Sequence, residues 1–311
     1  MTVSPTPPQP PQAATLEPSL SPRPGCKISW FEVEDPNSSQ LDALAKRFNL
    51  HPLQIEDCRH RPQRSKYEEH ELYLFSVIKQ IHNDTELIFS DIDVFIGKDF
   101  LITVTQGHST LMDRVHRRIE EDGTDRLDKA LYFLIDSLVD EYAPVIDLIA
   151  EETSDLEDTV LLDPGPDKLQ TIFRLKRKLI EFRRIASSMR EVVNAFMRKE
   201  RGLVGDDLDP YFRDVYDHLV RTIDLIETYR DLLAGSLDIY LSAVANRTNE
   251  VMKVLTIWGT VALPLVIITG FFGMNLALPW QHTPYGAIYA TVVMIGSVVV
   301  VLSYFRGKRW F

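Results

Sequence analysis

The chain has 311 residues, of which 45 are Asp or Glu and 34 are Lys or Arg, so its formal net charge at pH 7 is −11. This acidic balance argues against a nucleic-acid partner and is compatible with attraction of cations, although an ordinary solvated acidic surface has the same balance. The two cysteines, Cys26 and Cys58, form no CxxC pair, so the sequence indicates neither a disulfide framework nor a thiolate zinc site.

The first segment, residues 1–26, is crowded with Pro, Ser, Thr and Gln and contains no apolar stretch typical of a signal peptide. We therefore expect a disordered tail, and membrane targeting must come from elsewhere in the chain.

Residues 27–125 mix strand-like and helical patterns, which predicts a cytoplasmic α/β domain. Asn37, Ser38 and Ser39 offer N-caps before a helical run of apolar residues at positions 41, 44, 45 and 48. The segments rich in β-branched and aromatic residues, and so expected to be strands, are Ile28–Val33, Leu72–Ile81, Leu87–Ile96 and Phe100–Thr105.

Residues 126–208 show only helical periodicity, which predicts an antiparallel helical pair. The first helix is expected to run from about Leu131 through Ile149 and to stop before Asp163, and the second to cover Leu169–Met197. The first arm carries acidic residues and the second arm basic ones, so cross-helix ion pairs are expected.

A third helical segment, residues 209–272, begins with Asp209, a favourable N-cap, and Pro210, a favourable first helical residue. No further proline occurs until Pro264, so we predict one continuous helix. At 1.5 Å per residue it would be ~95 Å long, enough to connect a cytoplasmic domain with the far side of a membrane.

Two apolar runs without charged side chains lie near the end of the chain, Val254–Phe272 and Tyr285–Phe305. About 20 apolar residues in a helix are needed to cross a bilayer, and each run supplies them. The alternative, a buried helical hairpin in a soluble domain, is disfavoured by two uncharged runs of this length.

Positive charges flank the runs on the sides away from their connector, residues 273–284, which has none. The flanking residues are Arg247, Lys253, Arg306, Lys308 and Arg309. By the positive-inside rule, both ends of the membrane segment, and with them both termini, are expected in the cytoplasm.

A polar stripe follows one face of the long helix. Its members recur at spacings of three, four or seven: Asp238, Ser242, Ala245, Asn249, Met252, Thr256 and Leu263. Asp and Asn are costly against lipid, so this face should meet protein or water. The spacing fits helix packing as well as the lining of a pore, and a pore would require several copies of the helix in a symmetric oligomer.

The tripeptide Gly273-Met274-Asn275, at the outer end of the first span, favours the pore. Gly permits a tight turn at the helix end, and Asn offers a neutral oxygen to a passing cation.

Together with motifs in the rest of the chain, this tripeptide makes the sequence resemble the CorA family of divalent-cation transporters. The matching pieces are His51–Asp57, Arg64–Tyr67, Tyr132–Tyr142, Tyr211–Asp217, Asn249–Lys253 and Gly273–Asn275. The resemblance covers nearly all of the chain outside the Pro-rich tail. It implies an α+β membrane protein with an N-terminal α/β cytoplasmic domain, a long helical stalk and two C-terminal transmembrane helices, assembled as a homopentameric funnel in a prokaryotic inner or plasma membrane.

The resemblance also implies roles for individual residues along the pore. They are a selectivity ring of Gly273, Met274 and Asn275, polar rings of Asp238 and Asn249, and an apolar constriction of Met252, Leu255 and Leu263. Mg²⁺ is then expected as transported substrate and as regulator, with no cofactor and no catalytic residue. The implied regulatory metal sites lie between neighbouring subunits, with Asp57 opposite Asp214, and Glu56 and Asp136 in a second position.

Other functions stay open. Transport of Zn²⁺, Co²⁺ or Ni²⁺ by the same fold, as in ZntB, is one alternative, and a membrane-anchored sensor that conducts nothing is another. The connector departs from the family pattern because Leu276 to His282 contains no acidic residue, which removes a ring of negative charge from the entrance. A single histidine such as His282 is usually an interfacial residue rather than a zinc ligand.

Overall fold

The computed structural model describes residues 28–83, 87–198, 202–274, 285–308 and 310. The Pro-rich tail, Asn275, the connector residues 276–284 and Arg309 lie outside these residues. The chain divides into two compact units: the first comprises Met1–Leu156 and Gln170–Ala234, and the second comprises Glu157–Leu169 and Gly235–Phe311.

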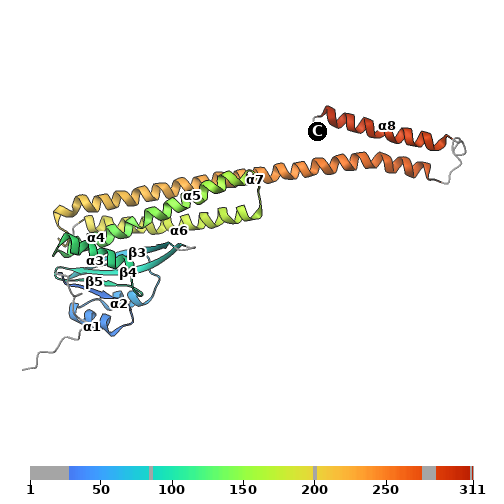
Figure 1. Cartoon of the computed structure of the whole chain (residues 1–311). Helices are drawn as coiled ribbons and strands as arrows, with labels where there is room; N and C mark the ends of the chain where they lie inside the picture. Colours follow the sequence, from blue (N-terminus) through green and yellow to red (C-terminus); the bar gives the residue numbers. More distant parts are fainter. Residues whose placement is uncertain (1–27, 84–86, 199–201, 275–284, 309, 311) are drawn as a thin grey trace, which may run out of the picture. The chain divides into compact units, whose positions relative to one another are not determined.

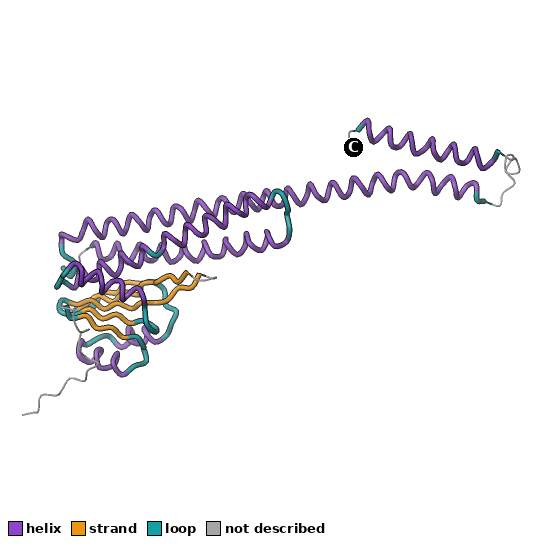
Figure 2. The backbone as a smooth tube through the Cα atoms, in the orientation of Figure 1, coloured by secondary structure: helices purple, strands orange, loops and turns teal. Residues whose placement is uncertain are grey.

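The strands lie in the N-terminal part of the chain, with α1 and α2 between β1 and β2, and the remaining helices follow (Figures 1 and 2). The strands are β1 (Trp30–Val33), β2 (Lys66–Glu69), β3 (Tyr73–Asn83), β4 (Leu87–Gly97) and β5 (Leu101–Val104). The helices are α1 (Ser39–Phe48), α2 (Pro52–Arg59), α3 (Thr110–Asp122), α4 (Leu127–Asp140), α5 (Tyr142–Val160), α6 (Pro166–Met197), a 3₁₀ turn η2 (Asp206–Leu208), α7 (Asp209–Phe272) and α8 (Gly286–Gly307).

The first unit is built on a five-stranded sheet with the order β1-β5-β4-β3-β2. β1 and β5 are parallel, and the other neighbours are antiparallel. The four predicted strands are confirmed within two residues at each end. β2 was not predicted, because its sequence Lys-Tyr-Glu-Glu lacks β-branched residues. It forms an edge strand, where charged side chains protect against further pairing, and Lys66 lies opposite Val77 of β3.

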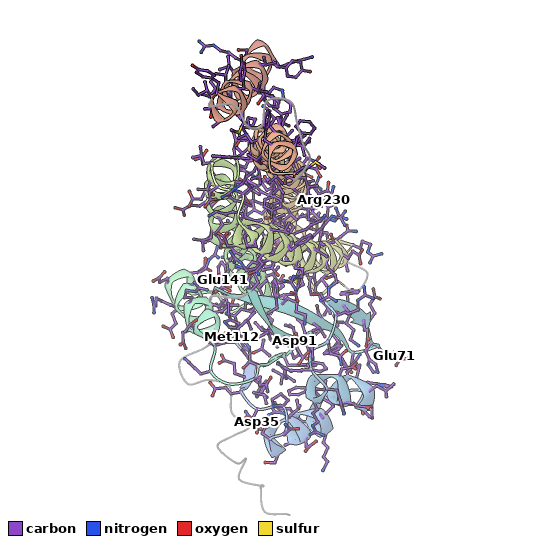
Figure 3. The ribbon with its side chains drawn as sticks, turned by 90° about the vertical axis from the view of Figure 1, so that its right-hand side faces the viewer. Asp35, Glu71, Asp91, Met112, Glu141 and Arg230 are labelled. Atoms are coloured by element: carbon purple, nitrogen blue, oxygen red, sulfur yellow. The ribbon has the colours of Figure 1, made fainter. Side chains whose placement is uncertain are left out.

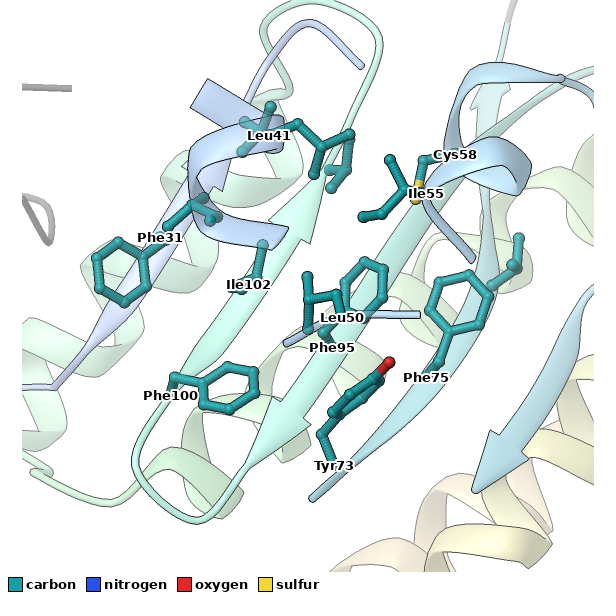
Figure 4. Close-up of a cluster of buried hydrophobic side chains, with 14 residues drawn as sticks. Phe31, Leu41, Leu50, Ile55, Cys58, Tyr73, Phe75, Phe95, Phe100 and Ile102 are labelled. Carbon is teal, nitrogen blue, oxygen red and sulfur yellow. The ribbon is translucent and has the colours of Figure 1, made fainter. Parts of the chain in front are cut away.

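One face of the sheet is covered by α1 and α2. Side chains alternate along a strand, so Phe31 of β1, Phe75 of β3 and Ile102 of β5 point to this same face. There they pack with Leu41 of α1 and Ile55 of α2 in a buried apolar cluster (Figure 4).

The opposite face of the sheet packs against α3 and the start of α5. Trp30 donates a hydrogen bond from Nε1 to Oγ1 of Thr103 over 2.9 Å, and its ring lies 4.2 Å from the ring of His116 in α3. The Tyr142 hydroxyl donates to the backbone oxygen of Lys79 in β3 over 2.7 Å. Helices therefore enclose both faces of the sheet.

The first arm of the expected helical pair is two helices, and the prediction of one was wrong. α4 ends at Asp140 and α5 begins at Tyr142, and Glu141, labelled in Figure 3, is the residue between them in the chain. Pro144 explains the break, because its ring clashes with the carbonyl group four residues earlier, that of Asp140, and it has no N–H to donate. α2 and α3 were likewise not predicted as helices.

The second arm, α6, confirms the predicted helix to its last residue, Met197. Within the first unit it packs beside α5 and α7, and ion pairs join the three helices: Arg174 of α6 lies 2.5 Å from Glu152 of α5, and Arg183 lies 2.8 Å from Glu227 of α7. The expected ion pairs between an acidic first arm and a basic second arm are therefore present.

α7 runs without interruption from Asp209 to Phe272, as the sequence predicted, with Pro264 inside it. In the second unit, α8 runs back beside the end of α7 (Figures 1 and 2). Both helices are long and apolar enough to cross a membrane.

Candidate ion pathway and regulatory carboxylates

In the second unit, α7 turns one face toward α8. Residues at helical spacing are half-buried on this face: Ile257, Val261, Pro264, Leu265, Ile268 and Phe272. The polar stripe lies elsewhere on the helix. At about 100° per residue, its mean direction is roughly 130° around the helix from that of the α8-facing residues. Asp238, Asn249, Met252 and Leu263 are all exposed.

Leu255 lies off the middle of the stripe. It is exposed, but its direction is about 100° from the mean direction of the stripe, on the flank that is also turned away from α8. Of the three apolar residues expected at the constriction, Met252 and Leu263 lie within the stripe and Leu255 lies beside it.

Two hydroxyl groups of the stripe donate hydrogen bonds to backbone oxygens one turn earlier in α7. Thr256 Oγ1 donates to the backbone oxygen of Met252 over 2.7 Å, and Ser242 Oγ donates to that of Asp238 over 2.9 Å. Because the donor is already satisfied, each hydroxyl oxygen can accept a hydrogen bond from a water or face a cation.

The selectivity tripeptide begins where α7 ends. The Gly273 amide donates to the Thr269 carbonyl over 2.9 Å, and the Met274 amide donates to that of Phe271 over 3.3 Å. Gly273 lies in a turn at the end of the helix, as expected. Its φ is not in the left-handed region, but a Cβ at this position would lie 3.0 Å from the Thr269 oxygen, closer than side chains normally approach. Asn275, the expected ligand, lies outside the described residues.

Helix α2 presents the first pair of candidate regulatory carboxylates. His51 is its N-cap, accepting from the Leu53 amide through Nδ1, and Pro52 starts the helix. Gln54, Ile55 and Cys58 face inward, so Glu56 and Asp57 face outward. They line a hollow of about 630 Å³. The whole lining is His51, Leu53, Gln54, Glu56, Asp57, Glu68, Glu69 and His70.

In this hollow Asp57 already has a cationic partner. Lys66 Nζ lies 2.6 Å from Asp57 Oδ2 and 2.6 Å from Glu68 Oε1. Burial alone would raise the pKa of Glu68, but hydrogen bonds from Lys66 and Gln54 outweigh burial and hold that pKa below its usual value. Glu56 is exposed and makes no ion pair with the described residues.

A buried polar network holds the C-terminal end of α2 to the sheet. Arg61 donates to the Cys58 carbonyl over 2.9 Å and to Asp93 Oδ2 over 2.5 Å. Asp91, labelled in Figure 3, pairs with Lys79 and accepts from the Gln63 amide over 2.6 Å. Burial raises the pKa of the Cys58 thiol, so this cysteine stays a neutral core residue.

The other candidate carboxylates, Asp136 and Asp214, lie on α4 and α7. Asp136 is nearly buried and accepts from Arg118 Nη1 over 2.5 Å. Asp214 is exposed and lies 3.8 Å from His218 Nε2, and the other ring nitrogen of His218 lies 3.9 Å from Asp140. Burial, followed by the Asp136 charge, raises the pKa of Asp140.

The structure thus groups the expected regulatory residues into two separate sets. Asp57 and Glu56 share the hollow at α2, and no hydrogen bond or ion pair between described residues joins them to Asp136 or Asp214. No cluster of three or more His, Cys, Asp or Glu side chains among the described residues is arranged to hold a metal ion.

Sequence reasoning missed the partners of these carboxylates, Lys66, Glu68 and His218. The sequence carried little signal for the first two, because Lys66 and Glu68 share a face only once β2 forms a strand, and β2 has little strand preference of its own. Their approach to Asp57 depends on the packing of α2 against the sheet, which no local pattern specifies.

Comparison with known proteins adds sequence relationships to this geometry. The family model described as "CorA-like Mg2+ transporter protein" matches residues 26–309. The chain is 38% identical over 291 residues to the cobalt/magnesium transport protein CorA of Thermotoga maritima, covering 91% of this chain and 83% of that one. It is 30% identical over 293 residues to the putative metal ion transporter YfjQ of Bacillus subtilis, with 91% of each chain covered.

Solved structures share the fold. The complete CorA magnesium transporter from Methanocaldococcus jannaschii matches with a TM-score of 0.80 at 22% identity, over 91% of each chain. The ZntB cytoplasmic domain from Vibrio parahaemolyticus matches with a TM-score of 0.59 at 14% identity, over 71% of this chain and 88% of that one. From the family match over nearly the whole chain, the α/β unit and the two candidate spans, we conclude that this protein is an integral membrane member of the CorA-like Mg²⁺ transporter family, a family of transporters and not of enzymes.

Proposed function

We propose that this chain forms a homopentameric channel through which Mg²⁺ passively enters the cytoplasm. In this proposal α7 of each subunit lines the pore, α8 faces lipid, and both termini are cytoplasmic. The basic residues flanking the spans support this orientation through the positive-inside rule.

The observation that carries the proposal is the position of the polar stripe. It is turned roughly 130° away from the face that meets α8, so α8 does not cover it. Asn249 lies close to the start of the first span, where a lipid-facing position would be costly, and copies of α7 arranged around a central axis would remove that cost. The relatives named as cobalt/magnesium or metal ion transporters support divalent-cation transport as the purpose of such a pore.

The chemistry of the stripe suits a hydrated divalent ion. Mg²⁺ loses its waters reluctantly, so neutral amide, hydroxyl and carbonyl oxygens can recognise the hydrated ion without binding it too firmly for passage. A doubly charged ion that moves inward gains ~4.6 kcal/mol per 100 mV of inside-negative potential, which drives uptake without ATP.

Regulation by cytosolic Mg²⁺ is part of the same proposal. Asp57 and Asp214 face outward in separate parts of the first unit, where the carboxylates of neighbouring subunits could meet. A divalent ion that binds between the two carboxylates would hold neighbouring subunits together, so the ion would stabilise a closed pentamer.

Ion flux into liposomes that contain the purified protein tests the proposal. We expect Mg²⁺ entry that increases with an inside-negative potential, and loss of entry in Asn275→Ala with assembly intact. A protein that assembles but admits no divalent ion would be a sensor and not a channel. Flux of Zn²⁺ without flux of Mg²⁺ would replace magnesium by zinc as the substrate. Undiminished flux in Asn275→Ala would remove Asn275 from the selectivity ring.

A further inference from the structure

Lys66 is held between Asp57 and Glu68, two carboxylates that line the hollow beside α2. Its ammonium group lies 2.6 Å from Asp57 Oδ2 and 2.6 Å from Glu68 Oε1, and 5.4 Å from the centre of the Phe75 ring. In the ion pair between Lys66 and Asp57, 28% of the lysine side chain and 27% of the aspartate side chain are exposed. Solvent therefore screens this pair only in part.

The surroundings fix this arrangement. Lys66 belongs to β2 and pairs in register with Val77 of β3. Glu68 Oε2 accepts from Gln54 Nε2 over 3.0 Å, and Gln54 Oε1 accepts from the Tyr73 hydroxyl over 2.6 Å. A hydrogen-bonded chain anchored in the core thus positions Glu68, and through it the lysine.

The hollow remains acidic despite the lysine. Its lining includes Glu56, Asp57, Glu68 and Glu69, whose negative charge attracts divalent cations. The Lys66 ammonium group already lies beside one of these carboxylates, that of Asp57. The ammonium group lies 2.6 Å from both Asp57 and Glu68, so the competitor brings its own positive charge to the site.

We propose that Lys66 is a built-in competitor for the divalent cation at Asp57. At low Mg²⁺ the lysine ammonium neutralises Asp57, and a divalent cation binds only by displacing it toward Glu68. Lys66 thereby sets the Mg²⁺ concentration at which the regulatory site fills. This inference rests on the proposed regulatory role of Asp57 and adds the element that determines its threshold.

The geometry supports displacement because Lys66 has a second partner. When its ammonium leaves Asp57 it retains the contact with Glu68, so Mg²⁺ binding does not leave a partly buried lysine without a counter-charge. A lysine paired with Asp57 alone would make the same displacement more costly.

The experiment measures Mg²⁺ protection of the full-length protein in detergent against chymotrypsin, which does not cut at lysine. We expect the Mg²⁺ concentration for half-protection to fall about three- to tenfold in Lys66→Gln, the effect of removing one partly screened unit charge from beside a doubly charged ion. Lys66→Thr is a second neutral variant, with a side chain suited to a strand, should the glutamine variant fail to fold. Lys66→Arg retains the charge and should stay close to the parent.

Lys129 provides a matched control. It forms an equally short ion pair, 2.7 Å from Asp122, with 32% and 31% of the two side chains exposed, and it also lies over a phenyl ring, that of Phe133. Lys129→Gln should leave the half-protection concentration unchanged. If the parent is protected and both neutral Lys66 variants need as much Mg²⁺ as the parent, the competitor role is overturned while the regulatory site survives. If Mg²⁺ does not protect the parent at all, the regulatory site itself is wrong, and the competitor role falls with it.

Discussion

Asp93 is a carboxyl group buried between the sheet and helix α2, and its ionisation links the stability of the first unit to pH. The residue is 0% exposed. Burial raises its pKa to about 6, the Asp91 charge adds to the rise, and Arg61 opposes it. In the unfolded chain the group titrates near 3.8. The folded state therefore binds the extra proton, so the stability contributed by Asp93 is present below pH ~4 and is lost as pH rises through ~6.

Asp93→Asn removes this titration and keeps the shape of the side chain. The melting temperature of the parent should therefore fall relative to that of the variant as the pH rises from 4 to 6. Above pH ~7 the difference between the two should be constant. Thermal unfolding of both proteins across this range measures the difference. A difference that is the same at every pH would contradict a raised pKa at Asp93.

Thr256 is the hydroxyl residue in the middle of the stripe, and its oxygen is free to accept because its hydrogen is donated to Met252. Thr256→Val keeps the shape and removes that oxygen. We expect Mg²⁺ flux to fall about fivefold, corresponding to ~1 kcal/mol for one hydrogen-bonding group.

Thr269 is the matched control for this substitution. Its hydroxyl makes the same kind of bond, to the Leu265 carbonyl over 2.8 Å, but it lies about 140° around the helix from the stripe. Thr269→Val should retain the parent flux. Equal losses in the two variants would show that the back-bonded hydroxyl supports the helix and not the ion.

At the scale of the element, two neighbouring isoleucines of α7 separate packing from pore lining. Ile268 is half-buried on the face toward α8, and Ile267 is exposed on the stripe side. We expect Ile268→Ala to destabilise the protein by about 1–2 kcal/mol, less than the ~2–5 kcal/mol of a fully buried isoleucine. Ile267→Ala should change flux with little effect on stability.

Thermal stability in detergent and liposome flux, measured on both variants, check this separation. The same loss of stability in the two proteins would mean that α8 does not pack against the face of α7 that carries Ile268.

At the scale of the whole molecule, the proposed pore requires several copies of α7 around the stripe. Chemical cross-linking of the purified protein in detergent should give a ladder that ends at five subunits. A dominant dimer would contradict the proposed pore, because two copies of α7 cannot surround an ion path.

The sequence by itself determined the features that depend on local patterns. The apolar runs predicted both spans, and the absence of proline between Pro210 and Pro264 predicted the unbroken α7, because helix continuity and membrane crossing depend on neighbouring residues. Four of the strands followed from their β-branched and aromatic residues. The break between α4 and α5 was also readable, at Pro144, but the apolar periodicity that continues past it obscured the signal.

Only the tertiary structure decided which side chains meet. β2 is a strand because β3 offers it a partner, since its own residues have little strand preference. The structure also decided that the stripe of α7 points away from α8, and that Lys66 lies between Asp57 and Glu68. These contacts join residues of different elements, and their distances depend on how helices pack on the sheet and on each other, which no short stretch of sequence specifies.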